Sequence, residues 1–143
     1  TVTTGRVLRV WETGTWSELA RVGYQESFEV NGDISRIVTV SGNNVEAWDI
    51  KESENVVRFD SHPALAITSM DGHWGALLGG EKGVRILNLQ SRDRPLEIPT
   101  SDEDSYVAFD SKGRRAAIGG GDDGPLQIWD LESKQNVFRF EIE

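Results

Sequence analysis

The two histidines are the residues of this chain whose chemistry could most readily serve catalysis or metal binding. His62 follows an apolar run that ends at Asp60, and His73 lies in the turn-like segment Asp-Gly-His-Trp. A nucleophile relay or a zinc site needs imidazoles with suitably placed partners, and the chain has no cysteine to supply thiolates. We therefore predict no catalytic residue, no metal site and no cofactor.

Two further segments have compositions found in ligand-binding loops. The acidic run at 101–104 lacks the spaced oxygen ligands and central glycine of a calcium loop, although Ser101 is a candidate phosphorylation site. The glycine-rich run at 119–124 lacks the Lys-Ser/Thr pair of a phosphate-binding loop. We interpret the glycine-rich run as a β-hairpin turn.

Four segments that share one residue pattern show that the chain is an internal repeat. They are VLRVWETG at 7–14, VEAWDIKE at 45–52, VRILNLQS at 84–91 and LQIWDLES at 126–133. The equivalent residues Trp11, Trp48, Leu87 and Trp129 are 37, 39 and 42 residues apart. Further short apolar runs, separated by Gly, Asn and Asp turn signals, surround each segment without any helical periodicity. The pattern predicts an all-β chain in which each unit has four short antiparallel strands.

These units resemble WD40 repeats, in which the third strand of a β-propeller blade ends in Trp-Asp. Trp48-Asp49 and Trp129-Asp130 match that signature fully, whereas Trp11-Glu12 and Leu87-Asn88 match it in part. The resemblance covers the whole chain and implies that the three tryptophans are core residues. It also implies that His62 and Asp123 stand where WD40 repeats have a histidine and a hairpin aspartate of one hydrogen-bond network.

The repeat divides the chain into blades. We predict the end of a truncated blade at 1–23 and blades at 24–60, 61–100 and 101–143. The resemblance implies a ring of about seven blades. We expect the remaining blades to come from the same parent protein rather than from a second copy. Each chain would end after the fourth strand of a blade and begin after the second, so two copies joined end to end would not continue the strand order.

Charge and hydropathy limit the classes of partner. The formal charge is −9, from 24 acidic and 15 basic residues, so nucleic acid is not expected as the primary partner. No apolar run approaches the roughly 20 residues that span a bilayer, and we predict no membrane insertion. The absence of cysteine is weakly in favour of a reducing compartment, so we predict an intracellular location, cytoplasmic or nuclear.

One face of such a propeller is expected to be acidic. The loops after the second and fourth strands of each blade lie on the same face, and they carry Asp60, His62, Glu81, Lys82, Asp102, Glu103, Asp104, Asp122 and Asp123. We predict that these loops bind a partner protein or a basic peptide. Trp16 and Trp74 belong to turns of the opposite face; an anchoring role is an alternative to packing against their own turns.

These observations favour a non-enzymatic interaction scaffold. Two alternatives stay open at this point. One is a propeller-fold hydrolase or lyase with its active site at the central channel, and the other is a substrate-receptor module of a larger multidomain protein.

Overall fold

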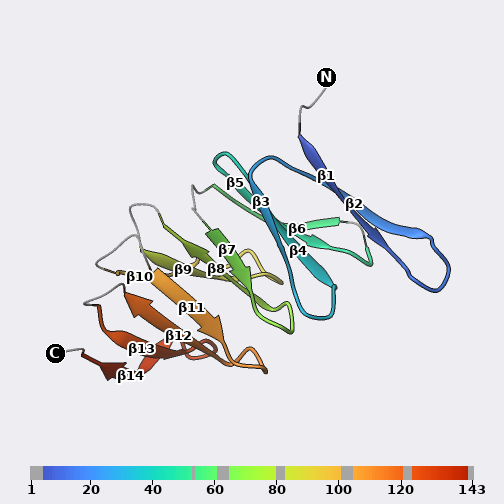
Figure 1. Cartoon of the computed structure of the whole chain (residues 1–143). Helices are drawn as coiled ribbons and strands as arrows, with labels where there is room; N and C mark the ends of the chain where they lie inside the picture. The colour runs from blue at the N-terminus through green and yellow to red at the C-terminus, as the bar shows by residue number, and fades with distance from the viewer. Residues whose placement is uncertain are drawn as a thin grey trace.

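The computed structural model describes residues 5–52, 54–60, 65–79, 83–100, 105–120 and 124–141. Every regular element in these ranges is a β-strand, and all strand pairs are antiparallel. The strands form a two-stranded sheet followed by three four-stranded sheets, which succeed one another in a curved row (Figure 1). This confirms the prediction of four-stranded antiparallel blades.

The sheets use the strands in chain order. The first sheet has β1 (Arg6–Trp11) and β2 (Glu18–Tyr24), and the second has β3 (Ser27–Val30), β4 (Arg36–Ser41), β5 (Asn44–Asp49) and β6 (Glu54–Asp60). The third has β7 (Leu65–Thr68), β8 (Trp74–Leu78), β9 (Val84–Asn88) and β10 (Leu96–Ile98), and the fourth has β11 (Ser105–Phe109), β12 (Arg115–Gly120), β13 (Leu126–Asp130) and β14 (Gln135–Phe140).

Three apolar layers hold neighbouring sheets together. Val22 and Ile37 belong to the layer between the first and second sheets, and Val45 and Leu77 belong to the layer between the second and third. Ile118 belongs to the layer between the third and fourth sheets. Because the second and third sheets are covered on both faces, their middle strands are apolar in both phases of the β alternation.

The Trp-Asp position of the repeat has a constant direction in the described arc. Trp48 packs into the layer toward the first sheet, Leu87 into the layer toward the second, and Trp129 into the layer toward the third. At Trp11, Trp48 and Trp129 the strand register also shifts in the same way, because one residue of the following strand is left out of the pairing. Trp48, Leu87 and Trp129 therefore each face the preceding sheet.

The expectation that Trp11 is a core residue is wrong for the described structure. Its side chain is 46% exposed, whereas Leu8 and Val10 of the same strand pack toward the second sheet. The physical reason is the direction just described, because none of the described residues forms a sheet on the side that Trp11 faces. Whether a residue at this strand position is buried thus depends on whether a neighbouring sheet packs on the side that it faces.

Candidate interaction site

The predicted acidic loops lie almost entirely outside the described residues. His62, Glu81, Lys82, Asp102, Glu103, Asp104, Asp122 and Asp123 are among the positions that the structure does not describe, and of Asp60 only the backbone, at the end of β6, is described. Their role in a binding face, and that of His62 and Asp123 in a repeat network, therefore stay predictions.

The turns between the first and second strands of the three complete sheets share one hydrogen-bond pattern. The backbone N–H groups of Arg36, Trp74 and Arg115 donate to side-chain oxygens of Asn31, Ser69 and Asp110, at 2.7, 3.0 and 3.1 Å. In each turn, the residue two positions before this N–H donor has a positive φ angle. The φ angles are 59° at Ile34, 70° at Gly72 and 61° at Gly113. The sequence repeat is therefore also a repeat of turn geometry.

These turns interlock from sheet to sheet. A Cβ atom on Gly72 would overlap the side chain of Asn31, and a Cβ atom on Gly113 would overlap the carboxylate of Asp71. The Asn31 amide also donates to the carbonyl oxygen of Met70 at 3.4 Å. Glycine thus permits a close approach that fixes adjacent blades relative to each other.

Ser69, Asp71 and His73 resemble a catalytic triad in composition only. The Ser69 hydroxyl donates to one oxygen of Asp71 at 2.6 Å, and Nδ1 of His73 lies 2.9 Å from the other. In a nucleophile relay the imidazole lies between the hydroxyl and the carboxylate, whereas here the carboxylate lies between them and Ser69 is fully buried. Partial burial would raise the pKa of Asp71, but hydrogen bonds from Ser69 and from the His73 backbone and ring outweigh it and lower the pKa. The arrangement stabilises a turn and does not activate a nucleophile.

The acidic residue of the Trp-Asp signature caps the next turn. Asp49 Oδ1 accepts a hydrogen bond from the backbone N–H of Glu52 at 3.0 Å, and Asp130 Oδ1 accepts one from that of Ser133 at 2.9 Å. Hydrogen bonds from the Ser133 backbone and hydroxyl lower the pKa of Asp130. Burial opposes the same effect at Asp49, but the pKa of Asp49 is still lowered.

Each of these aspartates lies opposite an arginine in the β-ladder. Arg36 pairs in register with Asp49, and the two side chains form an ion pair in which both are largely buried. Arg115 occupies the same place opposite Asp130 and contributes to the low pKa of Asp130. The second and fourth sheets thus use one arginine–aspartate pair at the same position.

The third sheet replaces both members of this pair. Trp74 stands where the other sheets have arginine, and its register partner Asn88 stands where they have aspartate. Asn88 keeps the capping function, because its Oδ1 accepts a hydrogen bond from the Gln90 backbone N–H at 2.8 Å. Trp74 is half-buried against the layer between the third and fourth sheets.

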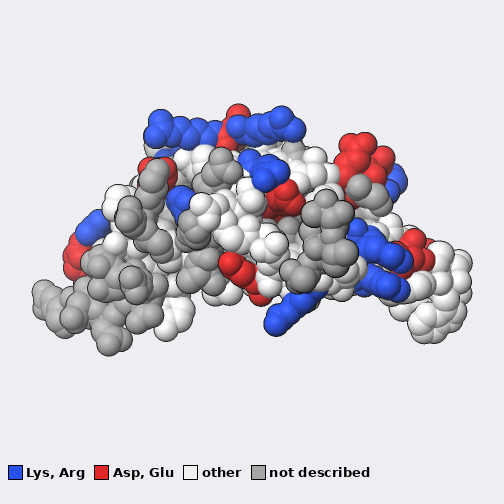
Figure 2. Space-filling model, turned by 90° about the horizontal axis from the view of Figure 1, so that it is seen from above, with Lys and Arg blue, Asp and Glu red and all other residues white. Residues whose placement is uncertain are grey.

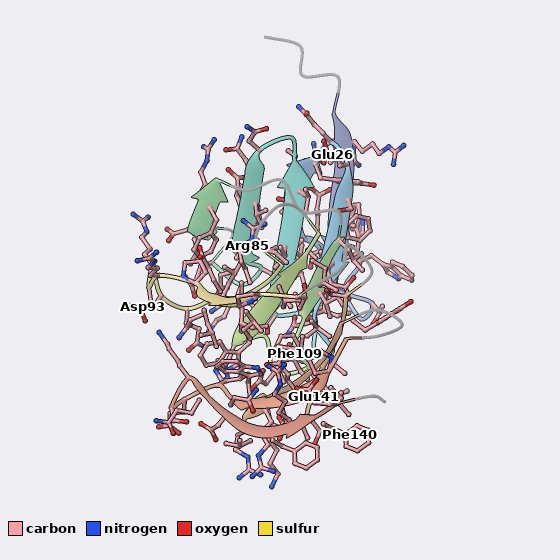
Figure 3. The ribbon with its side chains drawn as sticks, turned by 90° about the vertical axis from the view of Figure 1, so that its left-hand side faces the viewer. Glu26, Arg85, Asp93, Phe109, Phe140 and Glu141 are labelled. Atoms are coloured by element: carbon pink, nitrogen blue, oxygen red, sulfur yellow. The ribbon has the colours of Figure 1, made fainter. Side chains whose placement is uncertain are left out.

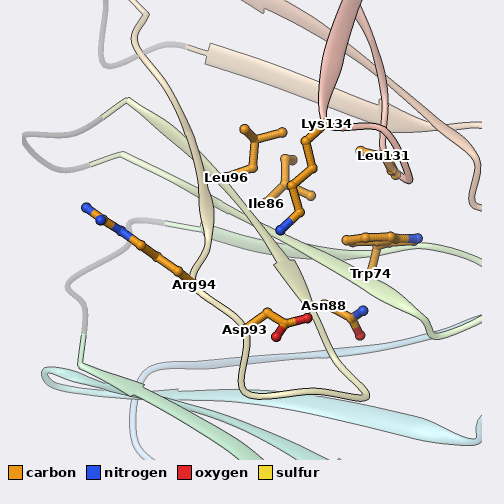
Figure 4. A pocket seen from close by; sticks show the side chains of 8 residues that line it. All are labelled: Trp74, Ile86, Asn88, Asp93, Arg94, Leu96, Leu131 and Lys134. Atoms are coloured by element: carbon orange, nitrogen blue, oxygen red, sulfur yellow. The ribbon is translucent and has the colours of Figure 1, made fainter.

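A cavity lies beside Trp74 and Asn88 (Figure 4). Its enclosed part has a volume of about 20 Å³ and is lined by Trp74, Ile86, Asn88, Asp93, Arg94, Leu96, Leu131 and Lys134. An open part of about 380 Å³ continues past Trp74 to His73, Gln90, Gly113, Arg114 and Glu132. We call the two parts together the Trp74 cleft.

A second hollow lies on the other side of the β9–β10 loop. This rim groove has a volume of about 570 Å³ and is lined by Glu46, Asn55, Arg58, Phe59, Arg92, Asp93, Arg94 and Pro95. Asp93 and Arg94 line both hollows, so the loop forms a ridge between them. Figure 3 places Asp93 at the edge of the molecule.

The other singled-out tryptophan has a different environment. Trp16 is 74% exposed, with a φ angle of 55°, in the turn between β1 and β2. Trp16 lines neither the Trp74 cleft nor the rim groove. Among the described residues, no group of three or more His, Cys, Asp or Glu side chains is placed to hold a metal ion. The described stretches also contain no helix that is long and apolar enough to span a membrane.

Sequence reasoning singled out Trp74 but not the site around it. The signal was present, since Trp74 and Asn88 both break the pattern of the other units. Reading it required the strand register, which shows that the two exceptions face each other. No sequence signal marked Lys134, and the proximity of Arg92 and Arg94 in the sequence was interpreted as that of solvated turn residues.

Comparisons with known proteins agree with the fold. Pre-mRNA-processing factor 19 of Oryza sativa subsp. japonica is 26% identical over 100 residues, which cover 66% of this chain and 19% of that protein. The β-propeller domain of Cps50 (Swd1) of Myceliophteria thermophila superposes with a TM-score of 0.65 at 13% identity, over 96% of this chain and 49% of that one. Hydrazine synthase of Kuenenia stuttgartiensis gives a TM-score of 0.58 at 16% identity, over 96% of this chain and 43% of that one.

No family model matches the sequence. This chain spans about a fifth of the length of the curated relative and less than half of each structure. The structural likenesses, at 13% and 16% identity, concern the fold alone.

Proposed function

We propose that this chain, which has the fold of WD40 β-propeller blades, is a non-enzymatic scaffold for protein–protein interaction. The observation that carries the proposal is the interlocking of the turns of successive sheets, in which Gly72 packs against Asn31 and Gly113 against Asp71. Such contacts fix the blades as one body and present their loops in a defined arrangement. Rigid presentation reduces the entropy lost when a partner binds.

The acidic loops are our proposed surface for a basic partner. Opposite charge increases the rate of encounter and favours the correct partner. Capture of partners from native extract, followed by mass spectrometry, tests this with the reversals Asp102→Lys, Asp104→Lys and Asp123→Lys. A discrete partner that is lost on reversal supports the acidic surface. A partner retained by the reversed protein contradicts it.

A matched control separates local charge from net charge. Glu52 and Glu54 are exposed residues of the turn and strand that end the second sheet, away from the predicted loops. The variants Glu52→Lys and Glu54→Lys change the net charge by the same amount as two loop reversals. We expect them to keep the partner.

The remaining blades of a propeller are a second proposed partner. The first sheet exposes Val7, Trp11 and Leu19, at 54, 46 and 46%. The last sheet exposes Phe138 and Phe140, at 50 and 55%, and Phe140 points away from the other sheets (Figure 3). Apolar sheet faces of this kind are rarely left uncovered.

The cellular location is likewise a proposal. The name of the relative from Oryza sativa refers to pre-mRNA processing, and this supports an intracellular location, cytoplasmic or nuclear. Imaging of the tagged protein in its native cells tests it. Export from the cell would contradict it.

A further inference from the structure

The third sheet departs from its neighbours in a way that leaves an aromatic side chain beside a cavity. In the second sheet, Arg36 at the start of the second strand is neutralised by Asp49 across the ladder. In the third sheet, Trp74 and Asn88 take these places, and both line the cavity. Asp49 in the second sheet and Asn88 in the third both accept a hydrogen bond from the backbone of the turn that follows. Formation of this turn therefore does not require asparagine in place of aspartate.

The cavity has an apolar wall on two sides. Trp74 and Leu96 come from the third sheet, and Leu131 comes from the turn that follows β13 in the fourth. All three pack in or against the apolar layer between these sheets, so the wall is fixed before any partner arrives. An apolar side chain that entered the open part would remove surface from water on both itself and Trp74.

The charged side chains that line the Trp74 cleft are Arg94, Arg114 and Lys134, with Asp93 and Glu132 of opposite sign. Lys134 projects its ammonium group into the cavity (Figure 4) and makes no ion pair with any described residue. Arg92 and Arg94 on the adjoining ridge also have no ion pair within the described part of the chain. In the same ridge, the Asp93 carboxylate accepts a hydrogen bond from the Ser91 hydroxyl at 2.7 Å.

The basic groups continue into the rim groove. Arg58 is held there by Asn44, whose Oδ1 accepts from Nε and Nη2 at 3.1 and 2.7 Å, and by Glu46 at 3.6 Å. Figure 2 shows a row of Lys and Arg side chains along its upper edge, which is the rear of Figure 1. The left side of Figure 3, where Asp93 lies, is the same rear edge. A local basic surface therefore exists on a chain with a net charge of −9.

We propose that the Trp74 cleft and the adjoining ridge bind an acidic peptide segment of a partner protein, with one apolar side chain of that segment seated against Trp74. The carboxylates of the segment lie near Lys134, Arg94 and Arg92. This inference rests on the proposed scaffold function and adds a second surface, at the opposite ends of the strands from the acidic loops. Two surfaces of opposite charge let one scaffold hold two chemically different partners.

The test uses labelled synthetic peptides and fluorescence anisotropy. The probe has one leucine flanked on both sides by glutamates, and its two controls replace the leucine by alanine or the glutamates by lysines. We expect the probe to bind, the alanine peptide to bind at least about tenfold more weakly, and the lysine peptide not to bind. Binding of the probe is also expected to weaken as salt is added.

The decisive variant restores the pair that the other sheets use. Trp74→Arg together with Asn88→Asp gives the third sheet the arginine and aspartate of its neighbours, so we expect the protein to remain folded by circular dichroism and thermal unfolding. Its affinity for the probe is expected to fall at least about tenfold. Lys134→Glu is expected to lower the affinity for the probe. It should leave the turn between β13 and β14 intact, since the Lys134 side chain makes no ion pair with the described residues.

The outcomes separate this inference from the proposed function. Unchanged probe affinity in the folded double variant, equal binding of the acidic and basic peptides, or no binding of the probe to the unaltered chain would overturn the inference. The reversals at Asp102 and Asp104 are expected to leave the probe affinity undiminished. If they abolish partner capture while probe binding remains, both surfaces act independently.

Discussion

Replacing Gly113 by alanine tests whether the turns of adjacent blades are locked together. Gly113 has a φ of 61°, and a Cβ atom there would overlap the carboxylate of Asp71 in the preceding sheet. Gly42 is a matched control, because its φ is 58° and a Cβ atom there would contact nothing within 4 Å. The two positions therefore share the backbone cost and differ in the contact.

The expected loss of stability has two parts, the left-handed backbone conformation and the overlap with Asp71. A left-handed conformation costs a residue with a side chain about 1–2 kcal/mol, and the reduced freedom of alanine in the unfolded chain offsets about 0.4–1 kcal/mol. Gly42→Ala should thus destabilise the fold by about 1 kcal/mol. At Gly113 the Asp71 carboxylate must move far enough to lose one of its hydrogen bonds to Ser69 and His73, and a hydrogen bond to a charged group contributes about 1.5–3 kcal/mol. We expect Gly113→Ala to cost about 2–4 kcal/mol in total.

Equilibrium urea unfolding followed by tryptophan fluorescence measures both free energies of unfolding. A double-mutant cycle with Asp71→Ala isolates the contact, since removal of this side chain should reduce the penalty of Gly113→Ala to that of Gly42→Ala. The reasoning is refuted if Gly113→Ala costs no more than Gly42→Ala. It is refuted equally if the excess penalty persists without the Asp71 side chain.

Three other substitutions probe the electrostatics and strain of the arc. Asp49→Asn removes the carboxylate that pairs with Arg36, and we expect a loss of about 2 kcal/mol in the free energy of unfolding near pH 7. Because the folded pKa of Asp49 is lowered, this contribution to stability is present above the ordinary aspartate pKa of about 3.9 and is lost as the pH falls through the folded pKa. If Asp49→Asn cost as much below the folded pKa as at pH 7, the assignment would be contradicted. Burial raises the pKa of Glu29, so Glu29→Gln should raise the urea midpoint at pH 7 but not below the ordinary glutamate pKa of about 4.3, and a pH-independent gain would point to another cause. Ile34, a β-branched and 54% exposed residue, has a φ of 59° where the equivalent turns have glycine; Ile34→Asn should stabilise the fold by up to about 1 kcal/mol in urea unfolding, and a lower midpoint would show that its packing outweighs its strain.

Several features of this protein were determined by the sequence itself. The spacing of Trp11, Trp48 and Trp129, with turn residues between apolar runs, was sufficient to predict four-stranded antiparallel blades, because alternation and turn chemistry act over a few residues. The capping role of Asp49 and Asp130 depends on the same short range, since each accepts a hydrogen bond from a residue three positions later.

Burial of the repeat tryptophans was decided by the tertiary structure. Trp11 and Trp48 occupy the same place in their strands, yet only Trp48 has a described sheet on the side it faces. No local pattern carries this information, because a side chain is buried by the neighbouring blade and not by its own strand. The prediction for Trp11 was therefore wrong, although its place in the repeat was correctly identified.

The candidate site likewise depends on contacts between blades. Trp74 and Asn88 are 14 positions apart in the sequence and become partners only through the strand register. Lys134 reaches the same cavity from the fourth sheet, and the loop at 91–95 forms its outer ridge. The sequence determined the strands and turns because these are local. Only the packing of one blade on the next placed an aromatic wall beside cations that form no ion pair with the described residues.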